Sequence, residues 1–227
     1  TAYEMLRSLV GSEMCIRDRR NARHVMDEDF CHWTNSEFEA LPYPQGKIKG
    51  ALNDYKGLVH WHSGTRLTDY NSMTDFMLWY WHLTGDRWGL EVARQWGDAV
   101  AQRYTGPFGY REGAGTCAAL LELYKDTLDE RYFRIADEIA RHLISTQKPD
   151  GSFPQWENYA PWLERYCELT GSEEAKAALV RWAEAYYNGY GDSFSNYGVG
   201  GELNILTYAY LYTGEVKYLA RAQWVAD

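Results

Sequence analysis

The chain has 227 residues, a formal net charge of −9 and an aromatic fraction of 16%, with 10 Trp and 19 Tyr. The excess of acidic residues argues against a nucleic acid as partner, and no apolar run approaches the roughly 18 residues of a membrane span. None of the 4 cysteines sits in a CxxC pair, so neither a disulfide framework nor a zinc site is indicated. The length suffices for one domain with a large core.

Both ends of the chain stand apart from the rest. Ser8–Asp18 read SLVGSEMCIRD, which resembles a translated sequencing-adapter read-through from an environmental reading frame, and we predict that Thr1–Arg19 make no core contacts. Residues 20–58 show no sustained period, which predicts an irregular lead-in or a loop covering the mouth of the domain. Trp224–Asp227 stop inside a helical pattern, so we expect a fragment truncated at its C-terminus.

The stretch His60–Asp86 combines a polar half with an apolar half. Its second half, Phe76–Leu83, is apolar or aromatic on nearly every side, which predicts a helix buried all round. Thr84-Gly85-Asp86 follow; glycine favours the left-handed position after a helix, and aspartate caps the next one. A polar loop is therefore expected to lead into a buried helix that turns tightly into a second helix.

This unit repeats along the chain. The turns fall at threonines 43 residues apart, Thr84, Thr127, Thr170 and Thr213. Thirteen residues after each threonine comes a small residue: Gly97, Ala140, Ala183 and Ala226. A fixed period in this range indicates a repeat architecture. The first helix of each pair is mostly apolar (Ser72–Leu83, Thr116–Lys125, Tyr159–Leu169 and Glu202–Tyr212), and the second is amphipathic.

Residues 59–227 are therefore expected to form an all-α domain, an α/α toroid in which an inner ring of buried helices is wrapped by an outer ring. Four hairpins are visible, so the (α/α)6 barrel would be incomplete. An open solenoid of helix pairs is the alternative that the same period permits. Unequal connections favour the toroid: the turns within hairpins are short, whereas the segments between hairpins are long and should all emerge at one end.

The first long connection, Gly57–Asn71, is dense in polar side chains. His60 and His62 are two residues apart and share a face if the segment is extended. Packing and capping do not readily explain the whole cluster, although Asp69 alone is accounted for as a helix cap. We predict that it forms a site together with the next helical turn: His60, His62, Arg66, Asp69, Tyr70, Asn71 and Asp75. His60, His62 and Asp69 have the chemistry of metal ligands, but their spacing matches no metal motif, so no cofactor is predicted.

The other long connections supply further candidates. Tyr104–Gly115 carry Tyr110, Arg111 and Glu112; the arginine can bind a carboxylate in two parallel hydrogen bonds or form a solvent-facing pair with Glu112. The segment QKPDGSFPQW resembles a loop common in α/α toroids and is expected to be mainly structural. We nevertheless add its tryptophan, and a tyrosine of the glycine-rich fourth connection, to the binding residues: Trp156 and Tyr197.

WHSGTRLTDYN followed by TGDRWGLEVARQWGD resembles the C-terminal α/α-toroid domain of exo-rhamnogalacturonan-lyase-like proteins. The resemblance covers Val59–Ala101 well and the rest of the chain as general toroid pattern. It implies a polysaccharide lyase that acts on an acidic, uronate-containing oligo- or polysaccharide outside the cell or in the periplasm. It also implies β-rich domains upstream of this fragment in the full-length protein.

β-Elimination requires neutralisation of a carboxylate, removal of the adjacent proton and protonation of the leaving oxygen. His60, His62 and Tyr70 suit the proton transfers, and Arg66 and Asn71 suit the carboxylate. One alternative is a glycoside hydrolase on the same fold, which needs two carboxylates. The other is a non-catalytic carbohydrate-binding or scaffolding toroid. Hydrolysis would draw on these acidic residues: Asp69 or Asp75 with Glu112 or Asp150.

Deleting Thr1–Arg19 should leave the thermal midpoint of unfolding unchanged, because these residues are predicted to make no core contacts. Circular dichroism melts of the two chains would measure this. A fall of several degrees in the shortened chain would show that the segment belongs to the fold.

Overall fold

A computed structural model describes Met26 and residues 59–61, 64–68, 73–154, 161–189 and 199–226. These residues are helical in the main, with eight helices and two short strands. The predicted all-α class is therefore confirmed. The chain divides into two compact units, of which unit 1 comprises Thr1–Leu67 with Thr74–Gln102, and unit 2 comprises Thr68–Met73 with Arg103–Asp227. Apart from Met26, the predicted adapter segment and lead-in lie outside the described residues.

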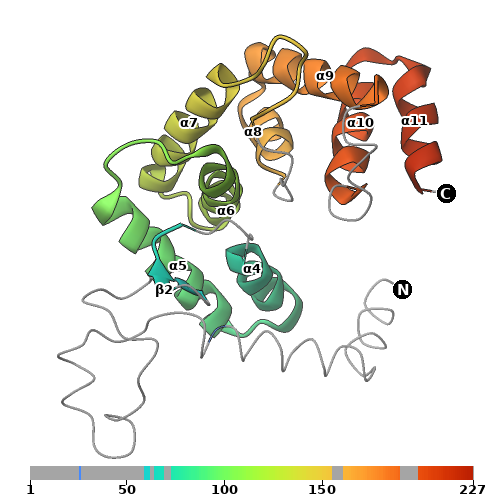
Figure 1. Ribbon diagram of the computed structural model, residues 1–227. Coiled ribbons are helices and arrows are strands. Elements are labelled where there is room, and N and C mark those ends of the chain that lie inside the picture. Colours follow the sequence, from blue (N-terminus) through green and yellow to red (C-terminus); the bar gives the residue numbers. More distant parts are fainter. Residues whose placement is uncertain are drawn as a thin grey trace, which may run out of the picture. The chain divides into compact units, whose positions relative to one another are not determined.

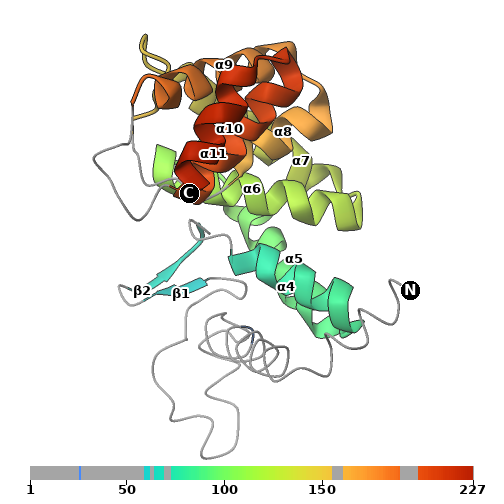
Figure 2. The same cartoon turned by 90° about the vertical axis from the view of Figure 1, so that its right-hand side faces the viewer.

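Unit 1 contains an antiparallel strand pair where the sequence predicts a loop. β1 (Val59–Trp61) pairs with β2 (Gly64–Arg66), with His60 opposite Thr65 and Trp61 opposite Gly64 (Figure 2). Each strand has only three residues, too few for a period-two pattern to stand out from the sequence. The backbone of the predicted catalytic segment is thus partly held by strand hydrogen bonds.

The hairpin of unit 1 consists of α4 (Met73–Thr84) and α5 (Arg87–Arg103). The two helices approach closely at Gly89, where an added Cβ would lie 2.4 Å from the carbonyl oxygen of Met77. α5 is amphipathic as predicted and buries Val92, Ala93, Trp96 and Val100 completely. The Trp96 indole donates a 2.9 Å hydrogen bond to the carbonyl oxygen of Leu67 and so ties α5 to the segment after β2.

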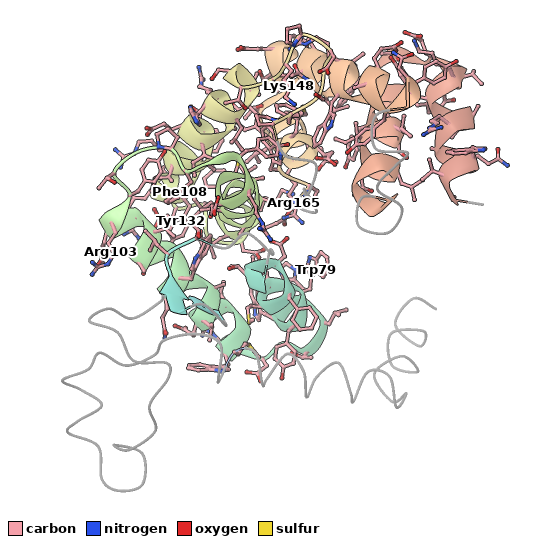
Figure 3. The ribbon with its side chains drawn as sticks, in the orientation of Figure 1. Trp79, Arg103, Phe108, Tyr132, Lys148 and Arg165 are labelled. Carbon is pink, nitrogen blue, oxygen red and sulfur yellow. The ribbon has the colours of Figure 1, made fainter. Side chains whose placement is uncertain are left out.

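α4 does not meet the expectation of burial on every side. Met77 and Leu78 are buried, whereas Trp79 is 53% exposed and Leu83 is 63% exposed (Figure 3). The exposed side chains, with Phe76, follow the spacing of one helical face. Within unit 1, α5 packs against α4 at the turn that contains Met77. The face of α4 that carries Phe76, Trp79 and Leu83 is not the face that α5 covers.

Unit 2 contains three hairpins that lie side by side in chain order (Figure 1). α6 contacts α8, α9 contacts α10, and α8 also contacts α10. Tyrosines connect neighbouring helices: Tyr166 donates a 2.6 Å hydrogen bond to Asp137, and Tyr218 donates one of 2.9 Å to Glu184. The helices are α6 (Tyr110–Thr127), α7 (Glu130–Ser145), α8 (Trp162–Thr170), α9 (Glu173–Tyr187), α10 (Val199–Thr213) and α11 (Val216–Ala226).

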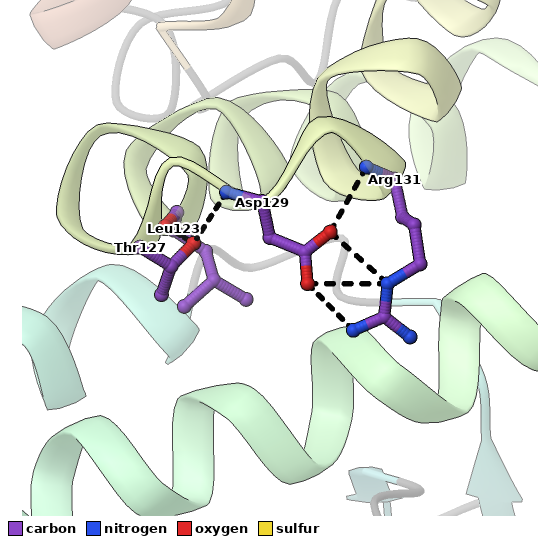
Figure 4. Close-up of polar contacts among 4 residues, drawn as sticks. All are labelled: Leu123, Thr127, Asp129 and Arg131. Carbon is purple, nitrogen blue, oxygen red and sulfur yellow. Dashed lines mark hydrogen bonds and ion pairs between the residues drawn. The ribbon is translucent and has the colours of Figure 1, made fainter.

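The turn between α6 and α7 is built around a threonine (Figure 4). The Thr127 hydroxyl donates a 2.7 Å hydrogen bond to the carbonyl oxygen of Leu123 and accepts one of 3.3 Å from the amide of Asp129. Asp129 then caps α7 by accepting from the amide of Arg131 at 3.0 Å, and its carboxylate pairs with the Arg131 guanidinium. One hydroxyl therefore joins the last turn of one helix to the cap of the next.

The other three turns use the same hydrogen bonds. Their threonine hydroxyls donate to the carbonyl oxygen four residues earlier and accept from the amide two residues later, as seen at Thr84, Thr170 and Thr213. In all four turns the residue after threonine is left-handed: Gly85, Leu128, Gly171 and Gly214, with φ of 73°, 55°, 66° and 72°. The described helices thus pair as hairpins ending at the predicted threonines.

α6 begins six residues earlier than the predicted Thr116, because it starts at Tyr110. The glycines of the segment suggested a loop, but Gly113 is buried inside the helix. An added Cβ there would lie 3.3 Å from both Ile139 Cγ2 and Leu143 Cδ2 of α7, so the glycine permits close packing of α6 on α7. Tyr110, Arg111 and Glu112 consequently lie on the first turn of a helix.

Leu128→Gly should stabilise the fold by about 0.5–1 kcal/mol. Relief of the left-handed strain, roughly 1–2 kcal/mol, outweighs the roughly 0.5–1 kcal/mol entropic cost of glycine. Little packing is lost because Leu128 is 72% exposed. Urea unfolding would measure the change. The reciprocal control, Gly171→Leu, should destabilise, since Gly171 has the same conformation with no atom within 4 Å of an added Cβ. A loss of stability in Leu128→Gly would contradict the strain argument.

Candidate functional site

The structure describes the side chains of four predicted site residues, Asp75, Tyr110, Arg111 and Glu112. His60 and Arg66 are described in their backbone alone, as members of β1 and β2. The remaining predicted site residues lie outside the described residues: His62, Asp69, Tyr70, Asn71, Trp156 and Tyr197. Convergence of these side chains at one end of a ring stays a prediction.

Asp75 lies in the first turn of α4 and is 4% exposed. A carboxylate in this position is favoured by the partial positive charge at the helix N-terminus. That interaction gives Asp75 a role in holding the start of the helix. Its predicted contact with substrate stays a prediction.

Tyr110, at the start of α6, belongs to an aromatic cluster in the core of unit 2. Its ring stacks on Phe153 at 5.2 Å between centroids and meets Trp162 edge-on at 6.3 Å. Phe153 in turn meets Trp182 at 4.8 Å. Tyr110 is 7% exposed, so packing alone accounts for its ring. Its neighbour Arg111 is exposed and Glu112 is half-buried, which leaves both accessible on the same helical turn.

The connection after α7 is held by its own hydrogen bonds. Asp150 accepts from the backbone amide of Ser152 at 2.9 Å and from its hydroxyl at 2.7 Å. Gly151 has φ of +86°, and an added Cβ would lie 2.2 Å from the carbonyl oxygen of Arg181. The hydrogen bonds from Ser152 lower the pKa of Asp150, which makes it a poor proton donor. This geometry agrees with a structural role and speaks against Asp150 as a hydrolytic acid.

A polar cluster that the sequence analysis did not single out lies on α8 and α10. Glu164 is in the first turn of α8 and is 3% exposed. Glu168, four residues on, is exposed and accepts a short hydrogen bond from the Tyr208 hydroxyl of α10. The ring of Tyr212 lies 6.1 Å from that of Tyr208. We call Glu164, Glu168, Tyr208 and Tyr212 the α8–α10 cluster.

Burial dominates the electrostatics of the α8–α10 cluster. Loss of solvation raises the pKa of Glu164 to about 7; its own backbone N–H and Arg165 oppose the rise, and Glu168 adds to it. Burial, with the charges of Cys167 and Glu168, raises the pKa of Tyr212 to about 12. The pKa of Tyr208 rises for the same reason and through its hydrogen bond to Glu168. Near neutral pH both tyrosines are therefore protonated, and Glu164 is present in both its protonated and its ionised form.

Arg165, the residue after Glu164, reaches toward α6 (Figure 3). Its Nε lies 3.1 Å from Glu122 Oε1, and its Nη1 donates a 3.1 Å hydrogen bond to the carbonyl oxygen of Ala118. Both charged groups of this pair are largely buried, with side-chain exposures of 10% and 18%. Arg165 thus links two successive hairpins of unit 2.

The sequence contained a signal for Glu164. The residues 43 and 86 positions upstream are Leu121 and Leu78, both buried, and the residue 43 positions downstream is Thr207. A glutamate at a position where two other hairpins bury leucine departs from the packing pattern. Functional residues that break a packing rule are detected by comparing repeats position by position.

Comparisons of the chain with protein-family models, with curated proteins and with solved structures found no match. Among the described side chains, no group of three or more His, Cys, Asp or Glu is arranged to hold a metal ion. The side chains of His60, His62 and Asp69 lie outside that set. Within the described ranges, no helix has the length and apolar character to cross a membrane.

Glu164→Gln should alter how stability depends on pH. A carboxyl with a raised folded-state pKa binds its proton more tightly when folded, so the wild type loses stability as the pH rises from 4.5 toward about 7. Glutamine does not titrate. The unfolding free energy of wild type relative to Glu164→Gln should therefore fall by about 3 kcal/mol between about pH 4 and about pH 8.

Urea unfolding across this pH range would measure the difference. Glu174→Gln, which alters an exposed carboxylate of α9, is the matched control and should show no such fall. A pH-independent difference for Glu164→Gln would show that Glu164 stays ionised in the folded protein.

Proposed function

We propose that the chain is a carbohydrate-active α/α-toroid domain from a polysaccharide lyase, which cleaves uronate-containing polysaccharide by β-elimination. The observation that carries the proposal is the set of helical hairpins closed by four like turns, preceded by the resembling stretch WHSGTRLTDYN. Each short turn occupies one end of its hairpin, so the long connections leave from the opposite end. If the hairpins are arranged in a ring, the long connections would all lie at the same end of that ring.

Each step of β-elimination has a candidate residue. Arg66 would pair with the uronate carboxylate, and Asn71 would donate a hydrogen bond to it, which makes the adjacent C–H more acidic. His60 or Tyr70 would remove that proton, and His62 or Tyr70 would protonate the leaving oxygen. Arg111, exposed on the first turn of α6, would bind a further acidic unit of the substrate. Under this proposal no metal is required.

Arg66→Ala should weaken the binding of a galacturonate oligosaccharide by roughly 10- to 150-fold, because a charge-assisted hydrogen bond contributes about 1.5–3 kcal/mol. His60→Ala and Tyr70→Phe should instead abolish turnover with little change in binding, as expected for groups that act in the transition state. Calorimetry would give the affinities, and the ultraviolet absorbance of the unsaturated product would give the rates. His142→Ala, which alters an exposed histidine of α7, is the control.

The product distinguishes this proposal from its alternatives. New reducing ends without an unsaturated sugar would indicate hydrolysis by a carboxylate pair. Binding without turnover would indicate a carbohydrate-binding or scaffolding domain. Full activity in His60→Ala, His62→Ala and Tyr70→Phe would place the chemistry elsewhere in the chain.

A further inference from the structure

The α8–α10 cluster contains a buried carboxyl group that packing does not explain. Leu121 and Leu78, 43 and 86 residues upstream of Glu164, are 0% and 1% exposed. A leucine at position 164 would bury apolar surface, whereas a carboxyl there must lose its hydration. A carboxyl group at position 164 is therefore expected to make the fold less stable than a leucine would.

One oxygen of the Glu164 carboxyl group can still accept or donate a hydrogen bond. Glu164 Oε2 is buried, and no described residue forms a hydrogen bond with it. The nearest cation in the sequence, Arg165, pairs with Glu122 and with the carbonyl oxygen of Ala118. A buried polar atom without a hydrogen-bond partner lowers the stability of the fold unless a ligand or a water molecule forms a hydrogen bond with it.

The rest of the α8–α10 cluster can contribute to the same ligand. Glu168 lies one helical turn beyond Glu164 on the same face of α8 and is exposed. Tyr208 and Tyr212 lie on α10, which contacts α8 (Figure 1). Lys176 Nζ lies 5.7 Å from the centre of the Tyr212 ring, on the side of α9. Two carboxyl groups and two tyrosine side chains thus come from adjacent helices.

We propose that Glu164, Glu168 and Tyr208 bind an uncharged, hydroxyl-rich ligand, namely a neutral sugar unit. The protonated carboxyl of Glu164 donates one hydrogen bond to a sugar oxygen, and Glu168 and Tyr208 accept from sugar hydroxyls. The negative charge of Glu168 disfavours a uronate here. The sugar ring would lie against the face of Tyr212 opposite Lys176. The choice of a sugar as ligand rests on the proposed function, which takes a carbohydrate as its substrate.

Glu164→Leu separates this role from a structural one. The variant restores the residue found at the equivalent positions of two other hairpins, so its thermal midpoint should rise by about 2–4 °C. Its affinity for neutral sugars should fall at least tenfold. Glu164→Gln, which keeps the shape and a donor, should retain more affinity than Glu164→Leu and serves if the leucine variant fails to fold. Glu174→Gln is the matched control and should bind as wild type.

Binding is measured by saturation-transfer NMR with rhamnose, galactose and arabinose, and with galacturonic acid as the charged comparison. The proposal is supported if at least one neutral sugar binds wild type and is lost in Glu164→Leu. It is overturned if no neutral sugar binds, or if Glu164→Leu binds neutral sugars as tightly as wild type. It is also overturned if only the binding of galacturonic acid is lost in Glu164→Leu. If Glu164→Leu lowers the thermal midpoint, full affinity of Glu164→Gln for neutral sugars overturns it. These readouts need no turnover, so a failure of the lyase assay leaves them interpretable.

Discussion

The pairing of the helices depends on the hydrogen bonds of one hydroxyl group, that of the threonine at the end of the first helix of each hairpin. Its hydroxyl donates a hydrogen bond to a carbonyl oxygen in the last turn of the first helix. The same hydroxyl accepts a hydrogen bond from the backbone amide of the residue that caps the second helix. The left-handed residue between them reverses the chain in two residues. Because all partners lie within six residues, the hairpin is specified locally. The long connections must then leave from the other end of each hairpin.

Aromatic contacts and tyrosine hydrogen bonds help to hold neighbouring hairpins of unit 2 together. Phe153, from the connection after α7, is fully buried between Tyr110, Trp162 and Trp182, and Tyr166 donates across to Asp137. A high aromatic content is compatible both with sugar binding and with core packing. In this part of the chain, packing and inter-helix hydrogen bonds account for many of the rings. The aromatic composition is therefore weak support for a carbohydrate ligand, and the argument for one rests on polar groups.

Glu164 is a buried carboxyl group at a position where two other hairpins bury leucine. Natural sequences usually satisfy local pattern and packing together, as a buried leucine such as Leu121 does. Burial raises the pKa of the Glu164 carboxyl to about 7, so near neutral pH part of the population carries the proton and can donate a hydrogen bond. The same burial lowers the stability of the fold above the pKa of the group. The raised pKa and the loss of stability have one physical cause, the loss of hydration on burial.

The sequence alone determined the helical class, the hairpin turns and the amphipathic face of α5, because each follows from contacts between residues close in the chain. It did not reveal that Gly113 is a packing residue of α6, that Trp79 is exposed, or that β1 and β2 pair. It placed His60 and Asp75 among the candidate residues. Glu164 departs from the leucines at Leu78 and Leu121 in the sequence, but its burial and its neighbours on α10 became visible only in the fold. Burial and loss of hydration depend on which helices lie side by side, and only the tertiary structure decides that.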